Sequence, residues 1–272
     1  AGYNRQGWTC SGLRPQIMNE MELTIPTTRG DIFAIYTEGD ASESMCQDDD
    51  SGRGPKPLVI LCHGLMMNCR QNPIMGFASS LNKAGYDTLR FDFRGSGLSS
   101  GDITKMTPLT EVDDLKDVVA HYKDRRIVLC GHSLGGLVSL MTAAEDPSIS
   151  ALVLLAPAVN IELDSRAGRV AIETFDPVNI PEFVEVWGSR LSRYYFTTAQ
   201  NLGIFERIAK YKGPVCVLMG ERDRIVELNL SEKLQEALPQ AQIHVIPHAE
   251  HLFSRGIRLK AAAVAVDFLR NF

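Results

Sequence analysis

The distribution of apolar positions predicts alternating strands and helices through most of the chain. Short apolar runs predict strands at 58–62, 88–91, 127–130, 151–155, 215–219 and 243–246. Apolar residues recur at helical spacing at 74–84, 109–122, 134–144, 231–237 and 258–269. Strands that are apolar on both faces and alternate with helices are typical of a parallel sheet covered on both sides. We therefore expect an α/β, doubly wound, mostly parallel sheet.

The beginning of the chain and one long interval depart from this alternation. Residues 16–25 and 31–36 are β-rich with no helix between them, which predicts an antiparallel hairpin at the sheet edge. Counting that hairpin, the sixth strand ends near Ala156, and 58 residues separate it from Val215. One crossover helix needs far fewer residues, and insertions at this edge of a parallel sheet lie where ligands bind. We expect a cap insertion at 157–200, with 1–156 and 201–272 forming the core of a single domain.

Composition narrows the class of partner. Hydrophobic residues make up 44% and charged residues 22%, as in an ordinary globular protein. The net charge of −5, with no basic block, argues against a nucleic-acid or anionic-membrane partner. No apolar run approaches the roughly 18 residues of a membrane span, and residues 1–14 lack a signal-peptide pattern. We expect a cytoplasmic protein that acts on a small molecule, with an exposed polar loop at 38–54. The sequence leaves open whether it is a monomer or a homodimer.

The cysteines do not form a metal or redox motif. Six occur, and none stand in a CxxC arrangement. Cys62, Cys130 and Cys216 lie inside apolar strand-like runs, where a free thiol behaves as a small hydrophobic residue. The sequence has no phosphate-binding glycine motif and no cluster with metal-ligand spacing. It therefore predicts neither a cofactor nor a metal.

The strongest chemical signal is the segment Gly131-His-Ser-Leu-Gly-Gly136. It matches G-x-S-x-G and stands directly after a predicted strand and before a predicted helix, which is the context this motif requires. A serine hydroxyl is a weak nucleophile, so it must project from a tight turn where a base can reach it. Gly131 and Gly135 allow that turn to close without a Cβ clash. We therefore expect Ser133 to be a catalytic nucleophile.

A serine nucleophile needs a carboxylate and a base, which follow it along the chain in the order serine, acid, histidine. The acid is expected after the next-to-last strand, where Glu221 and Asp223 compete, and we favour Asp223. The base is expected after the last strand, which precedes both His248 and His251. We favour His251, because a loop of that length is needed to swing back toward the serine. Asp223 would then orient the imidazole and stabilise its cation.

An oxyanion hole needs two converging N–H donors. One is expected from Leu134, immediately after the nucleophile, and the other from Leu65, in the loop after an early strand. His63 precedes that loop, and we interpret it as a structural hydrogen-bonding residue. Asp92 comes before the serine, which is the wrong order for a catalytic acid, so we interpret it as a buried carboxylate that fixes the following loop.

Several of these motifs together resemble the α/β-hydrolase superfamily over residues 17–272. They are His63-Gly64, Arg90-Phe-Asp-Phe-Arg-Gly-Ser-Gly-Leu-Ser99, Gly131-His-Ser-Leu-Gly-Gly136, and the late Asp223 and His251. Within the superfamily, residues 191–214 are similar to the feruloyl (cinnamoyl) esterase-like bacterial enzymes. The resemblance implies carboxylic-ester hydrolysis without a cofactor, a triad of Ser133, Asp223 and His251, and a cap after the sixth strand. Leu134 departs from it, because those esterases usually have glutamine after the nucleophile.

The expected function is a serine carboxylesterase for small to medium acyl or aryl esters, hydroxycinnamate esters included, with an acyl-enzyme on Ser133. An acylglycerol lipase, a thioesterase or a serine peptidase could use the same residues, because fold does not fix substrate. A slow-turnover binding or sensor protein that retains the triad is a third interpretation. Aromatic residues are concentrated in 157–200, and Trp187 and Tyr195 are candidate substrate contacts for a flat apolar group. Alternatively, these aromatic residues simply hold the insertion together.

Overall fold

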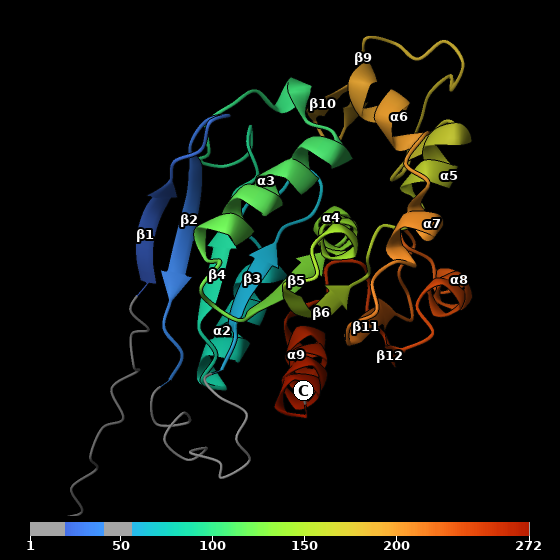
Figure 1. The fold of residues 1–272 in the computed structure, drawn as a ribbon. Coiled ribbons are helices and arrows are strands. Elements are labelled where there is room, and N and C mark those ends of the chain that lie inside the picture. Colours follow the sequence, from blue (N-terminus) through green and yellow to red (C-terminus); the bar gives the residue numbers. More distant parts are fainter. Residues whose placement is uncertain (1–19, 41–55, 272) are drawn as a thin grey trace, which may run out of the picture.

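The computed structural model describes residues 20–40 and 56–271. Eight strands form one sheet in the order β1-β2-β4-β3-β5-β6-β11-β12 (Figure 1). The pairs β1–β2 and β2–β4 are antiparallel, whereas every later neighbouring pair is parallel. The strands are β1 (Glu20–Ile25), β2 (Ile32–Thr37), β3 (Leu58–Cys62), β4 (Thr88–Phe91), β5 (Ile127–His132), β6 (Ile149–Leu155), β11 (Val215–Gly220) and β12 (Ala241–Ile246).

Helices cover both faces of this sheet. On one face α2 (Ile74–Lys83) packs against α9 (Arg255–Arg270), and on the other α3 (Pro108–His121) packs against α4 (Leu134–Glu145) (Figure 1). α8 (Leu230–Ala237) packs beside β12, and a short 3₁₀ helix, η1 (Ile103–Lys105), follows β4. Because both faces are covered, every residue of β3 and of β5 is buried. The edge strand β1 instead exposes most of its residues.

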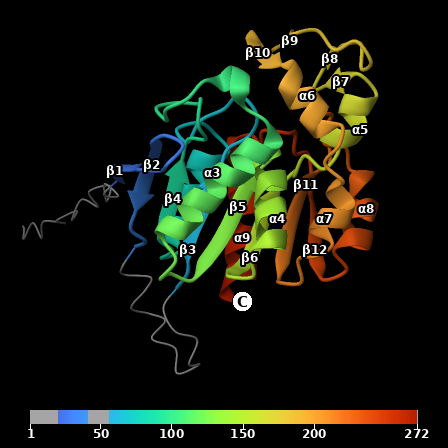
Figure 2. The same ribbon diagram turned by 45° about the horizontal axis from the view of Figure 1, so that its top comes forward.

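Residues 157–214 form only short elements, and we call this stretch the β6–β11 segment. They are α5 (Ile161–Arg166), β7 (Arg169–Val170), β8 (Glu173–Thr174), β9 (Phe183–Val186), β10 (Ser189–Ser192), α6 (Arg193–Ala199) and α7 (Ile204–Ile208). The elements from α5 to α6 lie together at one end of the sheet (Figure 2), where α6 packs against α3 and α5, and β10 packs against η1. α7 instead packs against α4 and α8. The division of the chain into a core and a cap at 157–200 remains a prediction.

The fold class predicted from the sequence is confirmed, including the antiparallel hairpin, which is described for Glu20–Ile25 and Ile32–Thr37. Residues 16–19 and most of the polar stretch at 38–54 lie outside the described residues. Element boundaries shift by a few positions; α9, for example, begins at Arg255, before the predicted 258. Within the described ranges, no helix has both the length and the apolar character needed to cross a membrane.

Candidate active site

Ser133 occupies a strained turn between β5 and α4. Its backbone has φ 54° and ψ −119°, a conformation that L-residues rarely adopt and that often marks a functional site. Only glycine fits at the neighbouring positions. A Cβ at Gly131 would lie 2.3 Å from the carbonyl oxygen of Gly135, and a Cβ at Gly135 would lie 2.4 Å from the carbonyl oxygen of His63. The glycines of the motif therefore let β5 and α4 approach closely enough to present the serine.

The structure brings the three predicted triad residues into one hydrogen-bonded line. His251 Nε2 lies 2.9 Å from Ser133 Oγ, and His251 Nδ1 lies 2.8 Å from Asp223 Oδ2. An ionised carboxylate only accepts, so Nδ1 carries the proton donated to Asp223, and Nε2 is free to accept from the serine. Asp223 follows β11 and His251 follows β12, at the ends of adjacent parallel strands. All three residues are buried.

The carboxylate of Asp223 is held in its ionised form. Burial raises the pKa of Asp223. The hydrogen bond and charge of His251, together with hydrogen bonds from two backbone amides, lower it by more, so the net pKa is below the usual value. The amides of Ile225 and Val226 donate to Oδ1 at 2.8 and 3.0 Å, which leaves Oδ2 for the histidine. The arrangement fixes the orientation of the imidazole and favours a positive charge on it.

A second histidine supports the loop that carries His251. His132, on β5, is buried, and its Nε2 donates to the backbone carbonyl of His251 at 2.9 Å. Burial and the neighbouring His251 lower the pKa of His132 to about 3, so it stays neutral near pH 7. His132 is therefore a neutral donor that holds the backbone of His251 in place.

The competing residues lie away from this line. His248 has 66% of its side chain exposed, and its backbone amide donates to Glu221 Oε2 at 2.7 Å. The same Glu221 oxygen lies 3.3 Å from His248 Nδ1. Glu221 and His248 are therefore partners of each other. Neither member of this pair reaches Ser133.

The loop after β3 is fixed by two buried polar side chains. His63 Nδ1 donates to the carbonyl of Gly64 at 2.9 Å, and its Nε2 accepts from the amide of Phe93 at 3.1 Å. Asp92 accepts from the amide of Cys69 at 2.7 Å. Both residues have the structural roles that the sequence suggested, and together they hold the loop that carries Leu65.

The expected oxyanion donors flank the serine. Leu134 is the first residue of α4, so its N–H has no acceptor inside the helix. Leu65 and Leu134 both line the cavity that contains Ser133. In the part of the chain that the structure describes, neither amide is hydrogen-bonded to a protein acceptor. Two free N–H groups beside the nucleophile are what an oxyanion hole requires.

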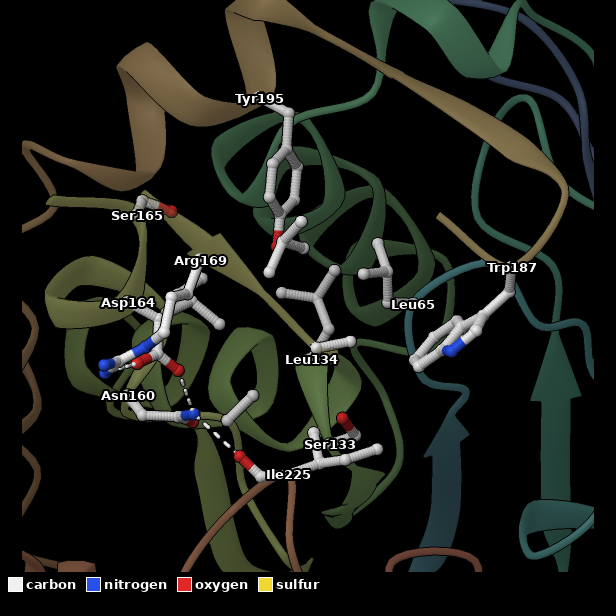
Figure 3. Close-up of a pocket in the computed structure, with 14 residues that line it drawn as sticks. Leu65, Ser133, Leu134, Asn160, Asp164, Ser165, Arg169, Trp187, Tyr195 and Ile225 are labelled. Carbon is white, nitrogen blue, oxygen red and sulfur yellow. Dashed lines mark hydrogen bonds and ion pairs between the residues drawn. The ribbon is translucent and has the colours of Figure 1, made fainter. Parts of the chain in front are cut away.

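Two hollows meet at Ser133. The inner cavity, of about 40 Å³, extends under the β6–β11 segment and is lined mainly by apolar side chains (Figure 3). The outer hollow is larger, about 460 Å³, and reaches His251 and Leu252. Ser133, Leu65, Trp187 and Ile225 line both. An ester bound at the serine can therefore place its acyl and alcohol parts in different hollows.

Trp187 stands at the tip of the β9–β10 hairpin. Trp187 and Gly188 both have positive φ, 50° and 77°, as a tight two-residue hairpin turn requires. Asparagine or glycine is favoured at such a position, and a bulky residue there is strained. The indole is 49% exposed and lines both hollows. The strained turn therefore places an aromatic side chain at the boundary between the two hollows.

Tyr195 lies deeper than Trp187. Its side chain is 1% exposed and lines only the inner cavity, into which its hydroxyl points in Figure 3. It also meets Phe196 edge to face, with ring centroids 5.2 Å apart, and Phe196 in turn contacts Phe175 at 4.3 Å. The aromatic residues of the β6–β11 segment therefore divide between packing and lining the cavity, and Tyr195 does both.

Sequence reasoning did not find the polar end of the inner cavity. Asn160 Nδ2 donates to Asp164 Oδ2 at 2.6 Å and to the carbonyl of Ile225 at 2.9 Å, while Arg169 pairs with Asp164 at 2.7 Å (Figure 3). All of these residues line the cavity. No sequence motif unites them, because α5 and β7 are too short to show a periodic pattern.

Comparison with known proteins supports the resemblance seen in the sequence. A family model, Hydrolase_4, described as serine aminopeptidase, S33, matches residues 53–199, more than half of the chain. The structure is similar to that of Est1E from Butyrivibrio proteoclasticus with ferulic acid bound. The TM-score is 0.79 at 28% identity, and the match covers 91% of this chain and 98% of the other.

Curated proteins give shorter or more distant matches. An uncharacterized 31.7 kDa protein of Escherichia coli is 34% identical over 103 residues, which cover 36% of this chain and 36% of that protein. The chain therefore spans only about a third of the length of that relative. A monoacylglycerol lipase of Mycolicibacterium smegmatis is 26% identical over 70% of this chain and 79% of its own.

Proposed function

Because the chain belongs to the Hydrolase_4 family (serine aminopeptidase, S33) and has the α/β-hydrolase fold, we propose that it is a serine carboxylesterase. The single observation that carries this proposal is the line from Ser133 Oγ through His251 to Asp223, with hydrogen bonds of 2.9 and 2.8 Å. Est1E, whose structure has ferulic acid bound, supports an ester of a hydroxycinnamic acid as one substrate class.

The geometry supports the following reaction. His251 Nε2 accepts the proton of Ser133 as Oγ attacks the ester carbonyl, and the amides of Leu65 and Leu134 stabilise the oxyanion that forms. Collapse breaks the bond to the alcohol, which takes the proton from His251 and leaves an acyl group on Ser133. Water, deprotonated by His251, then attacks the acyl-enzyme. Collapse of this second intermediate releases the acid as Ser133 Oγ takes the proton back from His251. Asp223 stays ionised throughout and stabilises the histidine cation.

The two hollows divide the substrate between them. The leaving alcohol must lie where His251 can protonate it, and His251 lines the outer hollow but not the inner one. The alcohol therefore occupies the outer hollow, and the acyl group points into the inner cavity, toward Tyr195. The inner cavity has room for only a few water molecules, so a short acyl group fits it directly. Trp187 lines both hollows, where its half-exposed indole can contact an aryl group.

A covalent probe tests the nucleophile. A fluorophosphonate should label the purified protein once, on Ser133, and mass spectrometry of the digested adduct locates the site. Ser133→Ala should lose both labelling and at least ~10⁴-fold of kcat on p-nitrophenyl esters. Ser139→Ala serves as the matched control, because Ser139 lies one and a half turns along α4, bonded to the carbonyl of Gly135. Labelling at another residue, or full activity of Ser133→Ala, contradicts the proposal.

A second candidate is an acylglycerol lipase. It is favoured by the similarity to the Mycolicibacterium lipase and by the wide outer hollow, where Trp187 and Leu252 expose apolar surface. A substrate scan separates the two. Methyl ferulate turned over faster than monoacylglycerols supports the esterase, and the reverse order supports the lipase. Stoichiometric labelling with no turnover of any ester would instead identify a sensor protein that retains the triad.

A further inference from the structure

A further pocket lies between α2, β4 and the first turn of α9. It shares no lining residue with the two hollows at Ser133. It has a volume of about 480 Å³, and Arg90, Arg255 and Arg258 all line it. The acidic residue at its wall is Glu20, which pairs with Arg90 and has a half-exposed side chain. Three guanidinium groups against one carboxylate give the pocket a positive charge, although the chain as a whole carries −5.

Arg90 lines the pocket and has an incomplete set of hydrogen-bond acceptors. The residue is 2% exposed; one of its terminal nitrogens donates to the carbonyl of Cys69 at 3.0 Å, and the other pairs with Glu20. Its Nε is buried and, among the described residues, has no hydrogen-bond acceptor. A buried donor without an acceptor is costly, and buried polar groups in proteins nearly always have a partner.

The first turn of α9 also has positive charges without acidic partners in the described part of the chain. Acidic residues are favoured at a helix N-terminus, yet this turn holds Arg255 and Arg258 and no acid. Arg258 has a long bond of 3.4 Å to the carbonyl of Phe253, and within residues 20–40 and 56–271 no carboxylate pairs with either arginine. Burial, and then the charge of Arg255, lower the pKa of Arg258. The two cations therefore repel each other, and no carboxylate of the described ranges pairs with either to offset that repulsion.

We propose that this pocket binds a phosphate group, either the free ion or that of a small phosphomonoester. Guanidinium groups bind phosphate oxygens through paired, charge-assisted hydrogen bonds, and a phosphate carries close to two negative charges at neutral pH. It would supply acceptors to Arg255 and Arg258, which have no carboxylate partner among the described residues, and the buried charge of Arg90 beside them would add to the attraction. The site lies outside the hydrolytic machinery and does not depend on the proposed function.

Two variants remove the site in different ways. Arg255→Gln combined with Arg258→Gln removes two charges. Gly76→Ala removes none: its Cβ would lie 2.4 Å from Arg258 Nε, so it displaces that guanidinium, and alanine suits the interior of α2 better than glycine does. Lys260→Gln is the matched control, because Lys260 is exposed on the same helix and does not line the pocket.

Isothermal titration calorimetry with sodium phosphate and with glycerol 3-phosphate, at constant ionic strength, tests the proposal. We expect saturable binding at one site by the wild type and by Lys260→Gln, and at least ~10-fold weaker binding by both pocket variants, about 1.4 kcal/mol. Tighter binding of glycerol 3-phosphate assigns the site to phosphomonoesters, and tighter binding of phosphate assigns it to the free ion. No saturable binding by the wild type, or equal binding by all variants, overturns the proposal.

Discussion

The sheet core and the β6–β11 segment both contribute residues to the hollows at Ser133, but the two regions are built differently. In the core, Ser133, Asp223 and His251 are at most 8% exposed, and each is held by hydrogen bonds from neighbouring elements. In the segment, Trp187 stands on a two-residue turn with half its surface exposed, and Tyr194 is 72% exposed. The residues that we propose for catalysis therefore lie in the tightly bonded core, whereas Trp187, which we propose as a substrate contact, stands on an exposed turn of the segment.

The largest expected effect comes from replacing a residue of the core, His251. His251→Ala should lower kcat by about 10⁴-fold or more, since the serine and its base act as one unit. His248→Ala is the matched control: it lies three residues away, is exposed and pairs with Glu221, so it should keep most of the activity. Steady-state kinetics on a p-nitrophenyl ester measures both. Loss of activity in His248→Ala alone would assign the base to the other histidine.

Asp223→Asn should be the next most damaging change. The amide keeps the shape of the carboxylate, but it can no longer hold the proton on Nδ1 and stabilise a histidine cation, so kcat should fall by about 10³- to 10⁴-fold. Glu221→Gln, at the competing carboxylate, should leave kcat within a few-fold. If Glu221→Gln were the inactive variant, the acid would have to be reassigned.

The difference between core and segment also explains what the sequence could predict. The turn at Ser133 could be predicted because its motif is local, and the meeting of Asp223 and His251 with it could be predicted from chain order along parallel strands. Their catalytic roles remain predictions. Asn160, Asp164 and Arg169 were not accessible, because they meet only when elements of two to six residues fold together. The turn at Trp187 was missed for a physical reason: a bulky residue with positive φ opposes the usual preference for asparagine or glycine.

His132 gives a pH-dependent test of the support behind the base. Its pKa is about 3 in the folded protein, against about 6.5 when unfolded, so below pH 6.5 the unfolded state binds a proton that the folded state does not. Stability is therefore lost as pH falls from 6.5 toward 3, by roughly 1.4 kcal/mol per pH unit. His132→Gln keeps a donor for the His251 carbonyl but does not titrate.

The measurement is urea unfolding at pH 7 and pH 4.5. Between these two values the His132→Gln variant should lose about 2.5 kcal/mol less stability than the wild type. His121→Gln, on the exposed surface of α3, controls for removing a histidine in general. Equal losses in all three proteins would show that His132 does not resist protonation in the folded state.

The smallest expected effect concerns selectivity, and it tests the segment side. Tyr195 is unsuited to the test because it is 1% exposed and packs on Phe196, so truncating it would also remove core contacts. Trp187→Asn separates the two roles, because asparagine suits the positive φ at this turn while the indole surface is lost. The unfolding free energy should stay level or rise. The ratio of kcat/KM for methyl ferulate to that for methyl butyrate should fall by roughly 5- to 30-fold, about 1–2 kcal/mol.

Tyr194→Ala, which removes an exposed aromatic residue that does not line the inner cavity, should leave the ratio unchanged. Equal losses on both esters in Trp187→Asn would mean that Trp187 contributes no aryl selectivity, and the hydroxycinnamate preference would then have to be abandoned.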